Sequence, residues 1–346
     1  MLARKPESSK TLHLRVGELV QIRTGDEILQ TLDAEGRLDA LPFMPEMLKF
    51  CGKRFRVVKR VDKICDTIDK TGFRRMKNAV LLEDIRCGGE AHGGCQASCM
   101  LLWKEDWLKR VSRDEPQRSE ITGCVSSVTH AGPATQATYT IGCTGAQLIS
   151  ATRRYTTSPD DEIYVCQNTE LSNATSPLAS WDVRQYFRDF WSGNVSTWEG
   201  VRGLLILLFN KVQGIRGGAI YPHINQGVLT KTPSQTLDLK AGDFAEVKSK
   251  HEIWQTLDTN NKNRGLWYDV EMLKFCGQRF KVHGNVQKMI NEKTGQMINF
   301  TTKHVLLEGV TCNGDCHNFC PRKEYIYWRE VWLRKVAIGA PDYSSK

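Results

Sequence analysis

The residues of this chain that are best suited to chemistry lie in two glycine-rich loops. The loops read CGGEAHGGCQASC and CNGDCHNFCP, and their cysteines are Cys87, Cys95 and Cys99 in the first and Cys312, Cys316 and Cys320 in the second. Thiolates bind zinc and iron–sulfur clusters, and glycine lets a backbone turn tightly around an ion. We therefore predict that these six cysteines are metal ligands.

Three thiols in each loop leave room for a fourth ligand from elsewhere in the chain. Cys51 and Cys276 are symmetric candidates, because each precedes a predicted strand that leads toward its loop. Cys166 and His92 are further candidates. The spacing is C-x7-C-x3-C in one loop and C-x3-C-x3-C in the other, which we interpret as loops of different length that have kept their thiols. The remaining cysteines, Cys65, Cys124 and Cys143, have no matching cysteine in the second half of the chain.

The identity of the metal stays open between two choices. Structural zinc is usually held by two close pairs of ligands, whereas three clustered thiols and a distant fourth are more typical of a [4Fe–4S] cluster. Cys320-Pro321 also resembles the end of a bacterial ferredoxin motif, but neither loop has a known cluster spacing. The third alternative is buried cysteine without metal, and it applies above all to Cys51 and Cys276, since free cysteine is among the most buried residue types.

Both loops belong to the two copies of an internal repeat. Residues 16–87 align with residues 241–312 without a gap, and 25 of the 72 positions are identical. EMLKFCGKRFRV, which begins at Glu46, matches EMLKFCGQRFKV, which begins at Glu271. Copies this far apart in the chain indicate a duplicated whole domain rather than the unit of a solenoid.

Each copy has the pattern of a small domain of short strands. An alternating segment predicts a strand over 17–23 and over 242–248, and a capping box that begins at Thr24 or Ser249 then opens a short helix. Two further strands lead into the cysteine loop, and a segment with two tryptophans closes the copy. We predict an α+β, mainly β fold of two tandem-duplicated SH3-like β-barrels joined by a partly helical middle segment; an open α+β unit is the alternative.

The predicted domain boundaries follow from the repeat. They are a first cysteine-rich repeat over 14–113, the middle segment over 114–239, a second cysteine-rich repeat over 240–338 and a tail over 339–346. The middle segment contains an apolar helix over 197–218. We predict that this helix packs as a core element between the two barrels; a helix that lies on a membrane surface is the alternative.

Composition limits the compartment and the partners. The 346 residues include twelve cysteines and carry a formal charge of +9. The sequence has no apolar signal region at its start and no apolar run longer than six residues, so we predict a cytoplasmic protein without a transmembrane segment, in which thiols stay reduced. The positive charge and the two W-x3-W pairs raise nucleic acid as a partner, but the tendency of tryptophan to be buried favours a core role for these rings.

The sequence lacks the motifs of several large enzyme classes. It contains no G-x-G-x-x-G, no G-x4-G-K-[ST], no H-E-x-x-H and no G-x-S-x-G. We also identify no grouping of His, Asp and Glu that recurs in both copies. Any catalysis is therefore expected to proceed through the thiols or the metal that they hold, and catalytic residues stay unassigned.

The whole chain resembles a family of bacterial hypothetical proteins with two copies of an SH3-like module. The stretches that carry the resemblance are GRLDALPFMPEMLKFCGKRFRV, RCGGEAHGGCQASC, YVCQNTEL, PLASWDVRQYFRDFWSGNV and CPRKEYIYWREVWLRKV. The family is associated with gene clusters for polysaccharide and specialised-metabolite biosynthesis. The resemblance implies an accessory or tailoring role in such a pathway, and it transfers no catalytic residue.

Three functions are consistent with these observations. The first is a metal-binding accessory or scaffold protein that holds zinc or an iron–sulfur cluster and contacts other proteins of a biosynthetic complex. The second is an iron–sulfur or thiol-dependent enzyme that acts on a small metabolite. The third, which is less favoured, is a nucleic-acid-binding protein.

Overall fold

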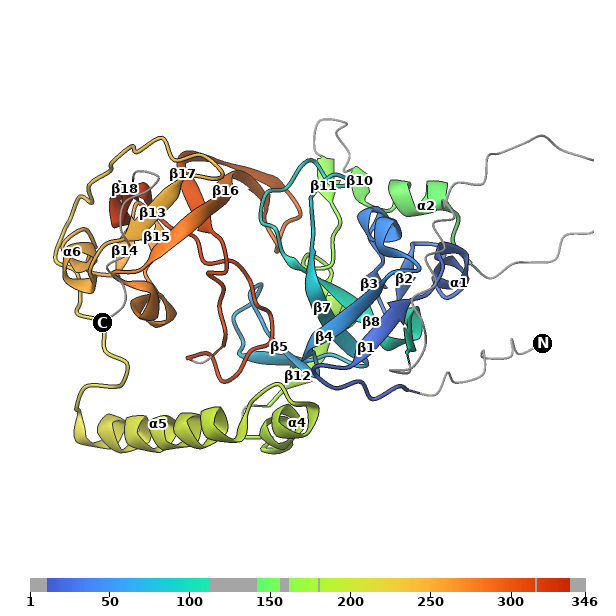
Figure 1. Ribbon diagram of the computed structural model, residues 1–346, viewed down its shortest axis with the longest axis horizontal. Helices are drawn as coiled ribbons and strands as arrows, with labels where there is room; N and C mark the ends of the chain where they lie inside the picture. The colour runs from blue at the N-terminus through green and yellow to red at the C-terminus, as the bar shows by residue number, and fades with distance from the viewer. Residues whose placement is uncertain (1–10, 112–141, 156–161, 180, 315, 337–346) are drawn as a thin grey trace, which may run out of the picture.

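The computed structural model describes residues 11–111, 142–155, 162–179, 181–314 and 316–336. It contains two curled antiparallel sheets with short helices at their edges, so the fold is α+β with two half-barrel units. Figure 1 shows the first unit in blue and teal and the second in orange and red, with two helices of the middle segment along one side of the molecule.

The first unit is a five-stranded sheet in the order β8-β7-β4-β1-β9. Its strands are β1 (Leu19–Ile22), β4 (Arg54–Arg60), β7 (Ala79–Arg86), β8 (Met100–Lys104) and β9 (Leu108–Arg110). The connections contain α1 (Gly25–Leu29), the hairpin β2 (Arg37–Leu38) and β3 (Leu41–Pro42), and the 3₁₀ helices η1 (Pro45–Phe50) and η2 (Glu105–Trp107). Because β9 pairs with β1, the last strand returns to the first and the sheet curls.

The second unit is a four-stranded sheet in the order β17-β16-β13-β18. Its strands are β13 (Phe244–Val247), β16 (Arg279–Ile290), β17 (Met297–Leu307) and β18 (Leu333–Val336). Its connections contain α6 (Lys250–Trp254), the hairpin β14 (Lys262–Asn263) and β15 (Leu266–Trp267), and the 3₁₀ helices η3 (Val270–Phe275) and η4 (Glu330–Trp332). The last strand, β18, again pairs with the first strand of the unit, β13.

The elements that both units share begin at matched positions of the repeat, as the sequence predicts. α1 begins at Gly25 and α6 at Lys250, and both predicted capping boxes, at Thr24 and Ser249, are present. In each box the side-chain oxygen accepts from a backbone N–H of the first turn while the glutamate three residues later reaches back. The local structure of the two units is therefore set by the same residues.

The units differ after the strands β4 and β16, which occupy matching positions of the repeat. In the first unit the chain leaves the sheet and forms a small three-stranded sheet, in the order β12-β6-β5, from β5 (Lys63–Cys65), β6 (Phe73–Arg75) and β12 (Ser176–Leu178). In the second unit β16 and β17 continue as one long hairpin. This hairpin reaches the first unit, where Gln96 N–H donates to the Lys288 carbonyl at 3.1 Å and Tyr164 N–H donates to the Gly295 carbonyl at 2.8 Å.

The described part of the middle segment packs mainly on the first unit. It contains α2 (Gly145–Ser150), β10 (Arg153–Tyr155), β11 (Glu162–Tyr164), α3 (Leu171–Ala174), β12, α4 (Arg184–Ser192) and α5 (Thr197–Arg216). Leu148 and Leu171 are fully buried in the core of the first unit. Gln167 covers the edge of β8, because its amide bonds to both the N–H and the carbonyl of Leu102, at 2.8 and 2.9 Å.

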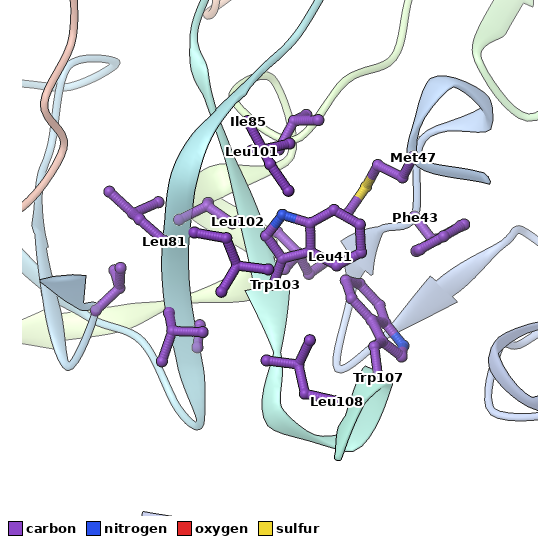
Figure 2. Close-up of a cluster of buried hydrophobic side chains, with 14 of the residues drawn as sticks. Leu41, Phe43, Met47, Leu81, Ile85, Leu101, Leu102, Trp103, Trp107 and Leu108 are labelled. Atoms are coloured by element: carbon purple, nitrogen blue, oxygen red, sulfur yellow. The ribbon is translucent and has the colours of Figure 1, made fainter. Parts of the chain in front are cut away.

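The W-x3-W pairs form the centres of the two cores. Figure 2 shows Trp103 and Trp107 beside Phe43, whose ring lies edge-on to both, with centroid distances of 6.1 and 5.1 Å. In the second unit Trp328 and Trp332 are equally buried. The core role of the four tryptophans is confirmed, and nucleic-acid recognition by stacking on these rings is wrong, because none of them reaches the surface.

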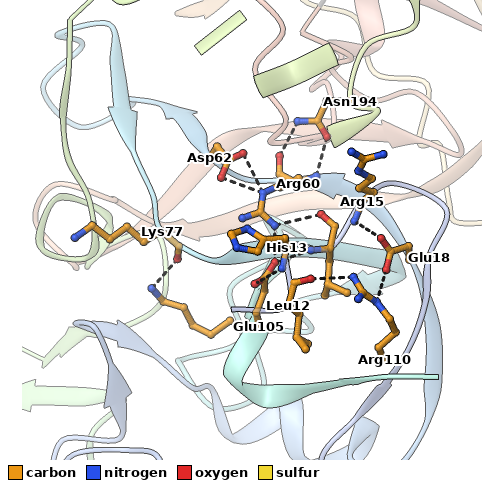
Figure 3. Close-up of polar contacts among 12 residues, drawn as sticks. Leu12, His13, Arg15, Glu18, Arg60, Asp62, Lys77, Glu105, Arg110 and Asn194 are labelled. Atoms are coloured by element: carbon orange, nitrogen blue, oxygen red, sulfur yellow. Dashed lines mark hydrogen bonds and ion pairs between the residues drawn. The ribbon is translucent and has the colours of Figure 1, made fainter. Parts of the chain in front are cut away.

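A buried ion-pair network fastens the N-terminal segment and the middle segment to the first unit. Glu105 accepts from the backbone N–H groups of His13 and Leu14, at 3.0 and 2.9 Å, and pairs with the Arg60 guanidinium. The Asn194 side-chain amide accepts a hydrogen bond from the Arg60 backbone N–H and donates one to the Arg60 carbonyl, both at 2.7 Å (Figure 3). These contacts position the start of α5 against β4.

Helix α5 lies on the outside of the molecule, so the prediction of a core helix is wrong (Figure 1). Leu204 is 66% exposed and Leu208 is 60% exposed. The inner face approaches the rings of Phe190 and Phe319 at Gly200 and Gly203, where an added Cβ would lie 1.9 and 2.4 Å from ring carbons. No residue of α5 is part of the described cores of the two units, which contain the four tryptophans. Among the described helices, none combines the length and the apolar character that crossing a membrane requires.

Candidate metal centres

Two neighbouring cavities receive the cysteines of the two loops. The first cavity, of about 40 Å³, is lined by the thiols of Cys87, Cys95, Cys99 and Cys166 together with His92. The second cavity, of about 510 Å³, is lined by the thiols of Cys65, Cys312, Cys316 and Cys320 together with His317. Each loop thus contributes three cysteines and meets a fourth cysteine from another part of the chain.

The two thiol-lined cavities share a wall. Ala97, Cys99, Met289 and Glu292 line both of them. Met289 belongs to β16 and Glu292 follows it, so the long hairpin of the second unit brings the two cysteine loops together. The Gln96 side chain fixes this arrangement by accepting from the backbone of the hairpin at 2.7 Å.

A compact group of three possible metal ligands lies beside the first cavity. The Cys87 thiol donates to Glu46 Oε1 at 3.3 Å and lies 3.3 Å from His92 Nε2. His92 Nδ1 is 3.4 Å from Glu46 Oε1. Glu46 Oε2 and His92 Nδ1 are buried and have no hydrogen-bond partner. Buried polar atoms of this kind are costly, and a bound cation would satisfy them.

The same group recurs beside the second cavity. Glu271, Cys312 and His317 have ligand atoms that all lie within 4.8 Å of one another, as do the three residues of the first group. His317 Nε2 is 3.2 Å from Asp269 Oδ1, and a carboxylate in this position orients an imidazole for metal binding. The first unit has Met44 at the matching position, so its histidine has no such partner there.

A glycine at the same place in each loop makes this geometry accessible. Gly89 and Gly314 have φ angles of +77° and +78°. A Cβ at these positions would lie 2.1 Å from the Cys95 carbonyl and 2.4 Å from the Cys320 carbonyl. The backbone therefore needs glycine both for the left-handed conformation and for the close approach of the next cysteine.

The electrostatics of the groups are those of buried neutral side chains. Burial raises the pKa of the Cys87 and Cys312 thiols, and the neighbouring glutamates raise it further. Burial lowers the pKa of His92, whereas the hydrogen bond with Asp269 raises the pKa of His317. Thiols with raised pKa values release protons when a metal binds, so metal affinity is expected to increase with pH.

The fourth thiol of the second cavity comes from the first unit. Cys65 Sγ lies 3.0 Å from Cys320 Sγ, and the Cys320 thiol donates to it. This hydrogen bond and the nearby Arg322 guanidinium lower the pKa of Cys65 to about 6. The sequence alone assigns no partner to Cys65, because no local signal connects β5 with a loop 255 residues away.

The structure places the two symmetric candidates for a fourth ligand elsewhere. Cys51 packs against the core of the first unit, and Cys276 packs against the core of the second unit, where the Tyr268 hydroxyl lies 3.1 Å from its thiol. Both residues are half-buried and line neither thiol-lined cavity. Cys143 is buried in the first core, and Cys124 lies outside the described residues.

Two interpretations of the sequence are wrong. The loops do not differ in length, because the ungapped match of the two copies continues through them, and both contain the motif C-x4-H-x2-C. A grouping of His and Glu does recur, since Glu46 and His92 match Glu271 and His317. Extending the ungapped alignment from Cys312 to Cys320 is enough to find the motif. The glutamates are the first letters of the repeated EMLKFCG stretch.

Comparison of the chain with protein-family models, with curated proteins and with solved structures finds no match.

Proposed function

We propose that this protein binds zinc at two equivalent centres, one in each unit, and acts as a cytoplasmic accessory or scaffold protein of a biosynthetic complex. The observation that supports the metal sites is the group of one Glu, one Cys and one His that recurs at matched positions with its ligand atoms within 4.8 Å. The biosynthetic context comes from the sequence resemblance alone.

The donor set suits zinc. Zinc in proteins takes thiolate, imidazole and carboxylate ligands in a tetrahedral arrangement, with bonds of about 2.0–2.3 Å, which places ligand atoms roughly 3.5 Å apart. Cys87 Sγ lies 3.3 Å from Glu46 Oε1 and 3.3 Å from His92 Nε2, which agrees with this requirement, and one ligand atom from each of the three residues lies within 4.8 Å of the others. Cys95 and Cys320, the last residues of the two C-x4-H-x2-C motifs, line the same cavities and supply the fourth ligand, a second thiolate, in this proposal.

In this proposal the ion has a structural role. Each unit is a small sheet whose final strand pairs with its first, and we assign both to SH3-like barrels that arose by duplication. An ion between Glu46 or Glu271, on a 3₁₀ helix, and the glycine-rich loop would close the open end of each sheet. Metal binding of this kind contributes directly to the free energy of folding.

A separate observation favours an iron–sulfur enzyme as the second candidate. Each cavity is lined by at least four cysteines, which are Cys87, Cys95, Cys99 and Cys166 in the first and Cys65, Cys312, Cys316 and Cys320, with the shared Cys99, in the second. Four thiolates are the usual ligands of a [4Fe–4S] cluster. The second cavity, of about 510 Å³, also has the size of a site for a small metabolite.

Metal analysis of the full chain, purified both with and without air, tests the two candidates. Colourless protein with about two zinc ions per chain supports the proposed function. Brown protein with absorbance near 400 nm and iron in place of zinc supports the second candidate. Protein with neither metal in both preparations contradicts both.

A pair of matched variants separates the two donor sets within one cavity. Cys87 belongs to both sets, whereas Cys99 belongs only to the set of four thiols, since Glu324 stands at its matching position in the second unit. If zinc binds the repeated group, Cys87→Ser loses one of the two ions and Cys99→Ser keeps both. If a cluster is bound, both variants lose it.

A further inference from the structure

Each unit has two charged residues at matching positions of the repeat, but the charges are opposite in the first unit and alike in the second. In the first unit Lys104 is fully buried, and its ammonium group lies 3.0 Å from the carboxylate of Asp39 and donates to the Lys77 carbonyl, also at 3.0 Å. In the second unit the residues at the matching positions of the repeat are Arg329 and Arg264. The buried cation has been kept, and the anion that neutralises it has been replaced by a second cation.

The buried guanidinium of Arg329 has no anionic partner among the described residues. It is 5% exposed and donates only to backbone carbonyls, those of Asn263 and Thr302 at 3.2 Å and that of Arg264 at 2.7 Å. Burial and the charge of Arg264 lower the pKa of Arg329 to about 10. A buried charge without a counter-ion is unfavourable, so an anion bound from outside the chain would stabilise this arrangement.

A cavity of about 310 Å³ opens beside the two arginines. Arg264 and Arg329 line it together with Phe300, His304 and Tyr327. His304 is 6% exposed, and its Nδ1 atom is buried without a hydrogen-bond partner. Its ring lies edge-on to Phe300 at 4.5 Å and to Tyr327 at 5.8 Å. The cavity therefore combines two guanidinium groups with an unpaired imidazole nitrogen and aromatic walls.

We propose that this cavity binds a small organic carboxylate with a flat apolar body. The carboxylate of the ligand takes the place that the Asp39 carboxylate holds in the first unit, and the planar guanidinium groups match it in geometry. The apolar body lies against Phe300 and Tyr327, and the volume is in the range of sites for small ligands. The inference does not depend on the proposed metal centres, because none of the arginines or rings belongs to them.

The site also adjoins the second thiol-lined cavity. Met289 and Tyr327 line both cavities. A ligand bound by the arginines therefore lies against the wall that separates it from Cys312 and Cys320. The lining places this carboxylate site next to a metal centre without making it part of the metal coordination.

Isothermal titration calorimetry of the full chain with benzoate tests the proposal. Benzoate is expected to bind the wild-type protein, and acetate, which has no flat body, is expected to bind at least tenfold more weakly. The variant Arg264→Asp gives the second unit an acidic residue at the position that matches Asp39 and should reduce benzoate affinity at least tenfold. Folding of this variant is not a concern, because Arg264 and Asp39 share the same left-handed backbone conformation, with φ of 47° and 49°.

A matched variant of the first unit is the control. Asp39→Asn should lower the melting temperature, because it leaves Lys104 without its anion, and it should leave benzoate affinity unchanged. Arg264→Asp should instead raise the melting temperature in the absence of benzoate. The proposal is overturned if benzoate does not bind, if Arg264→Asp binds benzoate as tightly as the wild type, or if inorganic phosphate binds in preference to benzoate.

Discussion

In the first unit, the buried Lys104 faces a carboxylate and the cysteine loop surrounds a cavity of about 40 Å³; in the second, the buried Arg329 faces another arginine and the loop borders a cavity of about 510 Å³. The histidine of the first group is fully buried, whereas the side chain of His317 is 40% exposed. Both units share most of their backbone elements and have the same ligand types. The difference shows that a matched buried cation has a carboxylate partner in the first unit and has none among the described residues of the second.

The largest expected effect separates two glutamates at matched positions. Glu105 accepts two backbone hydrogen bonds and pairs with buried Arg60. Glu330 accepts from the backbone of Leu237 and Leu239 and has no ion pair among the described residues, because Asn285 replaces the arginine. Glu105→Ala should therefore lower the free energy of unfolding by about 4 kcal/mol, since it breaks a buried ion pair, and Glu330→Ala by about 2 kcal/mol. Urea denaturation measures both.

The control for this pair is Glu83→Ala, in the exposed part of β7, which should change the free energy of unfolding by less than about 0.5 kcal/mol. Equal losses for the two buried glutamates would contradict the argument that Arg60 makes the difference.

The next effect concerns the response to acid that His304 gives to the second unit; Ala79 stands at the matching position of the first. Burial and the charge of Arg329 lower the pKa of His304 to about 4 from its ordinary value of 6.5. The unfolded chain thus binds a proton that the folded chain resists, and the stabilisation present above pH 6.5 is lost as the pH falls toward 4. The upper limit of this loss is about 3 kcal/mol.

Thermal unfolding between pH 7 and pH 4.5 measures this loss. The groups that face His304 are Arg329, Arg264 and Tyr327, and neither arginine changes charge in this range. The variant His304→Phe should have a flatter dependence of melting temperature on pH than the wild type. A wild-type slope retained in this variant would assign the effect to other groups.

A smaller effect separates the two candidate metal centres. Asp269→Asn removes the carboxylate that orients His317, so metal affinity should fall by about 10- to 100-fold at the second centre and stay unchanged at the first, which has Met44 at that position. Competition with a chromophoric chelator resolves two affinities per chain. A parallel loss at both centres would show that the two sites share their metal rather than bind it separately.

The smallest effect is one that should be the same in both units. Thr24→Ala and Ser249→Ala each remove one capping box, and each should cost about 1 kcal/mol of the free energy of unfolding. Denaturant titration of both variants checks this equality. Unequal losses would mean that the helices α1 and α6 contribute differently to their units despite their matched sequences.

Much of the fold could be predicted from the repeat and from local patterns. The strand over 17–23, the capping boxes and the buried tryptophan pairs all depend on residues close together in the chain. The exposed position of α5 could not be predicted, because an apolar sequence shows that a helix has an apolar face but not whether the core has room for it.

The candidate sites divide in the same way. The cysteine loops and their glycines are local features, and the recurrence of Cys, His and Glu at matched positions of the repeat is present in the sequence, where an alignment that continues past Cys312 finds it. Cys65 and Cys166 were not assignable to the right cavity, because each reaches its loop through contacts between distant segments.

The sequence by itself determined two copies of one module and the residue types that each module offers to a metal, because capping, strand alternation and glycine turns act over a few residues. Only the tertiary structure decided which thiol completes which cavity and which buried cation lacks its anion. Those properties depend on where the long hairpin of the second unit meets the first unit. They also depend on burial, because a buried charge is unfavourable without a counter-ion, whereas an exposed charge is solvated by water.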